Sequence, residues 1–392
     1  MKRPTDYEIE LGEIDRDISR LAERTDTTPL DAATATRYAY LLYHRASLTE
    51  NPREFEAAET AIDDAINQIG AWPDLCLLKA HLDFKLHRLA EARQDLEMAR
   101  GLAGFPQGRA LKADLDLQEG RYEQARKGYE SVIEDDPSWD NLARLAYFKA
   151  KMDDVEGAER LYIEAEEGIT AKQMRSYAWV ELQRGLLDLA HGRFDGARAH
   201  YERAREAYSG YWLIDEHIAR LLGTQGRYAE AAAVYGEVIA RVPRPDVQQA
   251  LGDVYASMGE ADKARSWHER ALAAYLESAE CGDVRYLHHL TEFYSDVRED
   301  GAEAVKWARK DLALRPNYST RAALAWALYR DGQLAGALGL MRAALSSGVR
   351  DARLFAQAAE IHRASGRAEE GRRYLREAAG INPHYQHVHA HL

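Results

Sequence analysis

One small residue recurs along this chain at a nearly constant interval, and that interval constrains the fold more than any other feature. Successive positions are 33 or 34 residues apart, except for two intervals of 39 and 40. A glycine stands five residues before six of these positions, and a proline stands twelve residues after four of them. A fixed period near 34 residues is typical of a solenoid built from stacked supersecondary units. The recurring residues are Ala58, Ala92, Ala125, Ala158, Ala197, Ala231, Ala264, Ala304, Ala337 and Gly371.

Each recurring feature has a physical role in a pair of helices. Glycine tolerates the left-handed conformation that ends a helix, and the small residue lets two helices cross closely. An aromatic residue four positions later lies on the same helix face and fills the groove. These aromatic residues are Tyr129, Tyr162, Tyr201 and Tyr235. A proline ends the second helix because it lacks an N–H and clashes with the preceding turn. The pattern therefore predicts an all-α fold without a sheet.

The same positions carry the pattern of a known repeat. Leu251, Gly252 and Tyr255 precede Ala264, and elsewhere an Ala-x3-Tyr step is followed by a proline. With these residues the chain resembles the tetratricopeptide repeat (TPR) family, whose pattern reads W-x2-L-G-x2-Y, then A-x3-F, then P. The early tryptophan is mostly absent here. The resemblance covers roughly residues 33–385 and implies a right-handed α-solenoid, the TPR superhelix, of about ten stacked antiparallel helix pairs.

The sequence divides into three parts. Apolar residues at a helical spacing within residues 1–32 predict a capping helix over the open apolar face of the first repeat. These apolar residues are Ile9, Ile14, Ile18 and Leu21. Residues 33–385 form the predicted array, and residues 386–392 form a histidine-containing C-terminal tail.

The two long intervals and the eighth repeat depart from the period. The excess residues lie at 164–178 and at 272–283, and the second stretch keeps helical spacing, which predicts an overlong second helix. In the eighth repeat, Leu287, Leu290 and Tyr294 lie one residue earlier than the spacing from Ala304 predicts. A turn that is one residue longer at 298–302 would reconcile the two registers.

Composition and charge exclude several classes of function. The chain of 392 residues has 52 Lys and Arg against 65 Asp and Glu, and its net charge of −13 argues against general binding of nucleic acid. No apolar run reaches the ~18 residues of a membrane span, and no secretory signal is visible, so we expect a cytoplasmic protein. Cys76 and Cys281 stand alone, which argues against a disulfide framework or a structural zinc site.

Catalytic and cofactor motifs are also missing from the sequence. It contains no GxxxxGK[ST], GxSxG or HExxH pattern, which predicts a non-enzymatic protein without a cofactor. The weak metal candidates are His387, His389 and His391, which would share one face of an extended tail. No carboxylate or cysteine stands beside them, so the prediction favours a tail without metal.

The first helix of each pair should line the concave face of the array, and off-core residues there form the predicted peptide-binding site. In the ninth repeat Trp326, Tyr329 and Arg330 share one face, and Trp, Tyr and Arg are the residues most often found at binding hot spots. Residues 318–392 carry a net charge of +4, so this end suits an acidic or aromatic-containing segment. The other predicted site residues are Arg144, Tyr147, Arg220, Arg353 and Arg363, with Lys151 beside them.

These observations favour a non-enzymatic interaction scaffold or adaptor that binds a peptide segment or partner protein in its concave groove. The first alternative is a ligand- or peptide-sensing regulator, in which binding changes the pitch of the array. The second is an accessory factor of a biosynthetic or metal-handling enzyme, for which the tail histidines are the hint. The Lys/Asn pattern with which the TPR family binds a peptide's terminal carboxylate is not found, so that specificity is not carried over. The partner's identity and the oligomeric state stay open.

Overall fold

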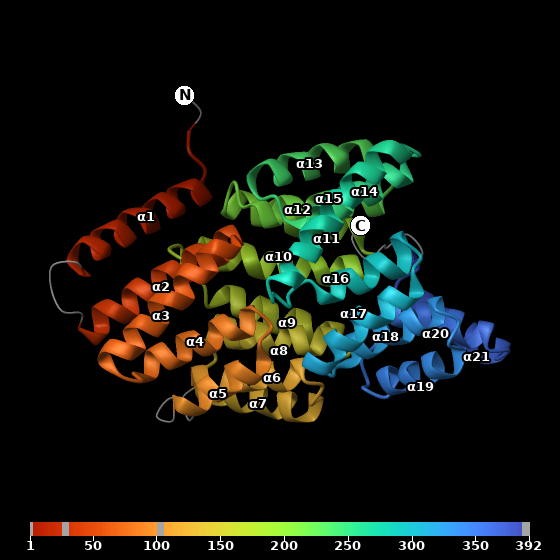
Figure 1. The fold of residues 1–392 in the computed structure, drawn as a ribbon, viewed down its shortest axis with the longest axis horizontal. Helices are drawn as coiled ribbons and strands as arrows, with labels where there is room; N and C mark the ends of the chain where they lie inside the picture. Colours follow the sequence, from red (N-terminus) through yellow and green to blue (C-terminus); the bar gives the residue numbers. More distant parts are fainter. Residues whose placement is uncertain (1–2, 26–30, 100–105, 386–392) are drawn as a thin grey trace.

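The computed structural model describes residues 3–25, 31–99 and 106–385. Within these ranges the chain forms 21 α-helices and one π-helical segment, η1, and no strand (Figure 1). The predicted all-α fold is confirmed. The helices are α1 Asp6–Thr25, α2 Ala32–Thr49, α3 Pro52–Ile69, α4 Pro73–Lys85, α5 Leu89–Met98, α6 Pro106–Gln118, α7 Tyr122–Asp135, α8 Trp139–Lys151, α9 Val155–Glu167, α10 Met174–Ala190, α11 Phe194–Ala207, α12 Trp212–Thr224, α13 Tyr228–Arg241, α14 Pro245–Ser257, α15 Ala261–Glu280, α16 Leu287–Glu292, η1 Phe293–Val297, α17 Gly301–Leu314, α18 Tyr318–Arg330, α19 Leu334–Leu345, α20 Ala352–Ala364 and α21 Ala368–Ile381.

From α2 onward, consecutive helices pack as pairs, and each pair stacks on the next. We number the pairs unit 1 (α2 and α3) to unit 10 (α20 and α21), with α16 and η1 together forming the first helix of unit 8. This arrangement is the solenoid of stacked helix pairs that the sequence pattern predicts. It resembles a TPR array.

The recurring residues lie where the helices of a unit cross. Ala231 and Tyr235 are both 0% exposed, and the recurring small residues of the other units are buried as well. The six recurring glycines all have φ between 71° and 77°, the left-handed region that favours glycine. Three of the four units without this glycine place His87, Asp153 or Glu299 at the same point, with φ of 62°, 64° and 53°; unit 1 is the exception, since Arg53 at this position lies within α3. The repeat therefore imposes one turn geometry, even where the residue type opposes it.

The departures from the period have three different structural causes. The first excess, at 164–178, forms a longer connection between α9 and α10 and extends α10 to 17 residues. The second produces the expected overlong helix, since α15 has 20 residues. The prediction of a longer turn at 298–302 is wrong. The extra residue is taken up inside the helix, because the N–H of Arg298 donates to the carbonyl of Phe293 at 3.0 Å and closes a π turn.

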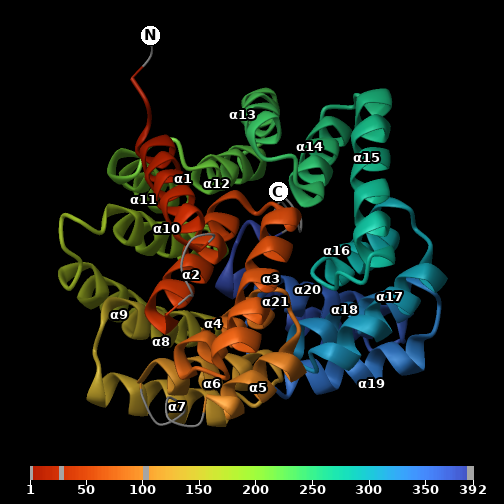
Figure 2. The same cartoon turned by 60° about the vertical axis from the view of Figure 1, so that its left-hand side comes forward.

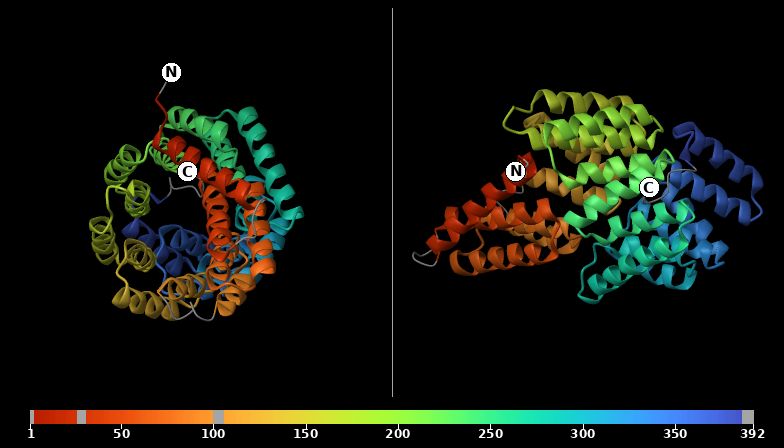
Figure 3. Two further views of the ribbon diagram at one scale, coloured as in Figure 1. Left: turned by 90° about the vertical axis from the view of Figure 1, so that its left-hand side faces the viewer. Right: turned by 90° about the horizontal axis from the view of Figure 1, so that it is seen from above.

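The units wind around a central axis, and units about 200 residues apart in sequence touch each other (Figure 3). Unit 3 contacts unit 9, since the Asn317 amide donates to the carbonyl of Gln118 at 2.9 Å. The N–H of Tyr318 donates to the hydroxyl of Tyr122 at 2.7 Å. The array is thus wound tightly enough for one turn to bond to the next.

Units 4 and 5 make similar contacts with the C-terminal part of the array. The N–H of Arg350 donates to the carbonyl of Lys151 at 3.2 Å, and its Nε donates to Asp153 at 2.9 Å. Next to α21, the Asn382 amide donates to the carbonyl of Leu189 at 3.4 Å. These bonds fix the second turn against the first.

The N-terminal helices close the first turn. Figure 2 shows α1 and α2 beside α11 and α12. The N–H of Tyr7 donates to the carbonyl of Ser209 at 3.1 Å, and the Trp212 indole donates to the carbonyl of Leu48 at 2.9 Å. One hydrophobic core runs from α1 and α2 into units 5, 6 and 7. Helix α1 therefore packs against the middle of the array as well as against unit 1.

Candidate functional site

A pocket of about 450 Å³ lies between the two turns of the array. Its walls come mainly from the first helices of units 4, 5, 6, 8, 9 and 10, and Ile381 at the end of α21 with Asn382 and Tyr385 completes them. We call it the central pocket. The charged and aromatic residues that line it are Tyr147, Lys151, Tyr162, His191, Arg220, His288, Glu292, Tyr318, Trp326, Arg350, Asp351, Arg353 and Tyr385.

Four of the predicted site residues line the central pocket: Tyr147, Arg220, Trp326 and Arg353. They come from α8, α12, α18 and α20, helices that meet here because the array closes on itself. Tyr147 is 38% exposed, so the packed helices do not cover it completely. Because the array closes on itself, residues from four separate helices line the same pocket.

Trp326 is partly buried and bonded to the preceding unit. Its indole N–H donates to Asp296 of η1 at 2.8 Å, and its ring lies 5.0 Å from that of Tyr329. One face of the indole thus packs within the array while the residue still lines the pocket.

The other predicted site residues of units 9 and 10 contact residues of the protein itself and are not among the residues that line the central pocket. Arg330 donates to a main-chain carbonyl of η1 at 2.9 Å and to Glu299 at 2.6 Å. Arg363 has an exposed side chain and pairs with Glu360 at 2.5 Å. The ring of Tyr329 packs against the Trp326 indole and the core of these units. Their predicted role in binding stays a prediction.

Arg144 is also engaged. Its Nε donates to Asp114 at 3.0 Å and its Nη1 to Asp140 at 2.8 Å, so it links α8 to unit 3. Asp114 in turn accepts from the Tyr129 hydroxyl at 2.8 Å. The pair with Asp140 is an i,i+4 pair within α8, but the sequence does not show the pair with Asp114, because that carboxylate comes from another unit.

The lining of the central pocket is positively charged, although the protein as a whole has a net charge of −13. Among the described residues, four Lys or Arg side chains and His288 face two carboxylates. His288 approaches Asp311 at 3.2 Å and Glu292 at 3.4 Å. Burial alone would lower its pKa, but these two carboxylates outweigh burial and raise the pKa of His288 to about 9. The imidazole is therefore charged at neutral pH.

Lys151 stands apart from the other cations of the lining. Arg353 donates to Glu292 at 2.6 Å, and Arg350 pairs with Asp153 and Glu377. Lys151 forms no ion pair with a carboxylate in the part of the chain that the structure describes; its Nζ lies 5.2 Å from the ring centroid of Tyr147. Tyr147 and Tyr318, and to a lesser extent the carboxylate of Asp351, raise the pKa of Lys151 against the effect of burial, so the ammonium group stays charged.

Ser295 is a second lining residue with an unused polar atom. It lies in η1 and is 0% exposed, and its hydroxyl has no hydrogen-bond partner among the described residues. Buried hydroxyls nearly always have a partner, because an unsatisfied one costs about 1–3 kcal/mol. Sequence reasoning missed Ser295, although the one-residue register mismatch of the eighth repeat was the signal that pointed to this segment.

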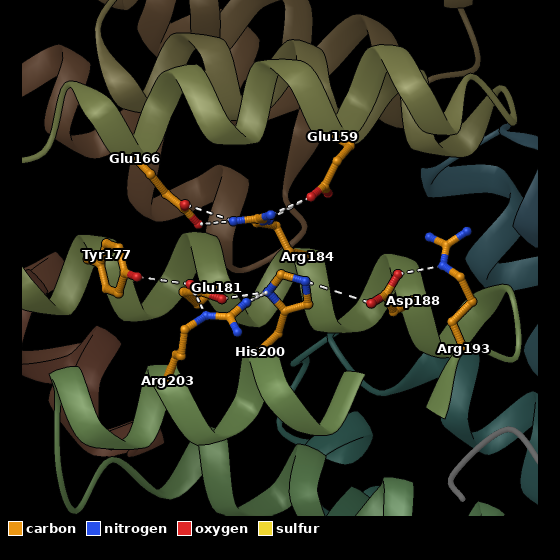
Figure 4. Close-up of polar contacts among 9 residues, drawn as sticks. All are labelled: Glu159, Glu166, Tyr177, Glu181, Arg184, Asp188, Arg193, His200 and Arg203. Atoms are coloured by element: carbon orange, nitrogen blue, oxygen red, sulfur yellow. Dashed lines mark hydrogen bonds and ion pairs between the residues drawn. The ribbon is translucent and has the colours of Figure 1, made fainter. Parts of the chain in front are cut away.

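Helix α10, which forms one wall of the pocket, is tied to its neighbours by a network of charged side chains (Figure 4). Arg184 donates to Glu166 of α9 at 2.8 Å and also to Glu159. Asp188 accepts from Arg193 at 2.6 Å. The network fixes α10 between α9 of unit 4 and α11 of its own unit.

Glu181 forms the centre of the other half of this network. It is 1% exposed, and it accepts from Arg203 at 2.6 Å and from Tyr177 at 2.9 Å, while His200 lies at 2.5 Å. Burial alone would raise its pKa, but these hydrogen bonds lower the pKa of Glu181 to about 2. Glu181 is thus a fully partnered carboxylate with no proton to donate at neutral pH, which fits a structural role.

The described residues contain no group of three or more His, Cys, Asp or Glu side chains arranged to hold a metal ion. The weak metal candidates His387, His389 and His391 lie outside the described residues. Within the same ranges, no helix combines the length and the apolar character that crossing a membrane requires.

Similarity to known proteins is found in structure but not in sequence. No protein-family profile matches the sequence, and no curated protein matches it. Among solved structures, the chain is similar to a tetratricopeptide repeat protein from Parabacteroides merdae ATCC 43184, with 18% identity and a TM-score of 0.40. The similarity covers 60% of this chain and 92% of the other. By its own repeat pattern and its stacked helix pairs, the chain is a TPR-like α-solenoid.

Proposed function

We propose that this protein is a non-enzymatic scaffold that binds a segment of a partner protein in the central pocket. The observation that carries the proposal is the convergence of Tyr147, Arg220, Trp326 and Arg353 on one pocket from four separate units. Aromatic and Arg side chains in a partly desolvated site are the usual source of binding energy.

The size of the pocket defines what it can hold. A volume of about 450 Å³ lies within the range of ligand-binding sites and accommodates a few side chains of a segment rather than a folded domain. The indole of Trp326 and the phenol of Tyr147 offer apolar surface with a polar end, and the guanidinium groups can bind carboxylates with two hydrogen bonds. The lining therefore supports recognition of a short, partly acidic segment.

A photoreactive phenylalanine analogue placed at Tyr147 tests the proposal. The control carries the same analogue at Ile163 on the outer helix of the same unit, where the side chain is 41% exposed against 38% for Tyr147. We expect a partner protein to be crosslinked from Tyr147 and to be absent from Ile163 after irradiation in cell extract. A partner crosslinked from Ile163 alone would move the binding surface to the outside of the array.

A ligand-sensing regulator is the second candidate, and the contacts between turns favour it. Arg350 lines the central pocket and also bonds to unit 4, so an occupant of the pocket would touch a residue that holds the turns together. Binding would then change the pitch of the array. This candidate is tested by X-ray scattering of the protein with and without the segment of the partner that crosslinks to Tyr147. An unchanged radius of gyration would contradict the regulator and favour a scaffold that does not change shape on binding.

A further inference from the structure

The π turn of unit 8 brings an unsatisfied polar group to the wall of the central pocket. π turns cost hydrogen-bond geometry and recur at functional sites. Here the turn contains Ser295, whose hydroxyl is fully buried and has no partner among the described residues, and Asp296, which binds the Trp326 indole. A π turn shifts the residues after it by one position relative to those before it. The irregular helix thus places a hydrogen-bond donor where the fold itself makes no use of it.

Lys151 supplies the complementary charge from the opposite turn of the array. It is the last residue of α8, and its ammonium group lies beside two tyrosines, Tyr147 and Tyr318, rather than in an ion pair in the described part of the chain. Asp351 attracts this ammonium group without forming an ion pair with it. Arg350 and Arg353 already bind carboxylates of the protein directly, so of these three cations Lys151 has the most charge left for an added anion.

We propose that the segment bound in the central pocket is acidic, that one of its side-chain carboxylates pairs with Lys151, and that the Ser295 hydroxyl donates a hydrogen bond to another of its oxygens. This inference rests on the proposed function and names the chemistry of its occupant. The positive lining excludes a basic segment, because like charges brought together without solvent repel.

The probe is a fluorescently labelled triglutamate peptide with an amidated C-terminus, so that only side-chain carboxylates are available. Triglutamine is the neutral control. We expect triglutamate to bind the wild-type protein and triglutamine to bind at least tenfold more weakly, measured by fluorescence anisotropy. The same peptide with a free C-terminus should bind with a similar Kd. Binding that requires the free terminus would overturn the side-chain assignment.

Lys151→Met tests the ion pair, and Lys149→Met is its matched control on the same helix. Lys149 pairs with Asp154 at 2.6 Å and is not part of the pocket lining described above. We expect Lys151→Met to weaken binding of the amidated triglutamate about tenfold or more, Lys151→Arg to retain most of it, and Lys149→Met to leave the Kd unchanged. Melting temperatures near that of the wild type confirm that each variant is folded. Equal affinities of Lys151→Met and Lys149→Met would overturn the assignment.

Ser295→Ala separates a binding role from a structural one. If the hydroxyl serves only the ligand, removing it relieves an unsatisfied group, so the melting temperature of the unliganded protein should stay the same or rise. The Kd for triglutamate should nevertheless increase several-fold. A lower melting temperature with unchanged affinity would show that the hydroxyl is used by the fold, and the assignment of Ser295 would be wrong.

The outcomes separate this inference from the proposed function. A partner crosslinked from Tyr147 whose yield is unaffected by Lys151→Met keeps the scaffold and overturns the acidic segment. Triglutamate binding that depends on Lys151, without any protein crosslinked from Tyr147, keeps the anion site and overturns the scaffold.

Discussion

Glu299 occupies a backbone position that six other units fill with glycine. Its φ of 53° is unfavourable for a residue with a Cβ, by about 1–2 kcal/mol. The side chain is 72% exposed and pairs with Arg330, an interaction that contributes about 0–1 kcal/mol at the surface. At this scale the turn geometry of the repeat overrides the preference of the individual residue.

Replacing Glu299 by glycine and by alanine isolates that strain. Both variants lose the ion pair with Arg330, but only glycine relieves the left-handed conformation. We expect Glu299→Gly to be more stable than Glu299→Ala by about 1 kcal/mol in urea unfolding. Equal free energies of unfolding would show that this turn is not strained.

His288 makes the stability of the fold depend on pH. Its pKa is raised from 6.5 to about 9, because Glu292 and Asp311 outweigh the effect of burial, so the protonated form stabilises the folded state. This contribution is complete below pH 6.5 and is lost as the pH rises through 9. We expect the stability difference between the wild type and His288→Gln to fall across this window, by at most about 1.4 kcal/mol per pH unit. A difference independent of pH between 6 and 9.5 would contradict the assigned charge.

Within one unit, the fold depends on how closely two helices can cross. Ala231 lies where α12 and α13 cross most closely and is 0% exposed. Tyr235 fills the groove one turn later. The sequence pattern predicts this crossing correctly because it is local, and a small residue, alanine in nine units and glycine in the tenth, recurs at this position. The π turn of unit 8 was not foreseen, since either a longer turn or a longer helix would satisfy the spacing.

Ala231→Phe should destabilise the protein by about 1–3 kcal/mol or more, because a ring cannot be placed between the crossing helices. Ala233→Phe introduces the same ring at an exposed position of the same helix and serves as the control. Thermal melting monitored by circular dichroism measures both. If the two variants melt at the same temperature, the assigned helix crossing is wrong.

For the whole molecule, the decisive contacts join units that are not neighbours. A Cβ on Gly120 would lie 2.7 Å from the carbonyl oxygen of Pro316 in the next turn of the array. Gly226 has nearly the same φ, 74° against 75°, but nothing lies within 4 Å of its Cβ position. These two glycines therefore separate backbone strain from contact between turns.

Gly120→Ala and Gly226→Ala carry the same strain, so any difference between them reports on the contact between turns. We expect Gly120→Ala to be less stable by about 1 kcal/mol or more, or to separate the turns and increase the radius of gyration in X-ray scattering. Identical melting and identical scattering of the two variants would show that the turns do not touch at this point in solution.

The sequence by itself determined the helix pairs, their period and the residues that face the core, because each of these depends on contacts within about 34 residues. It also placed Tyr147, Arg220, Trp326 and Arg353 on the concave face. Only the tertiary structure decided that these residues share one pocket and that Arg144 and Arg330 are held by carboxylates of other units. The physical reason is that the pitch of the array is the sum of small rotations between successive units. Closure then depends on residues about 200 positions apart, whose partnership no local pattern encodes.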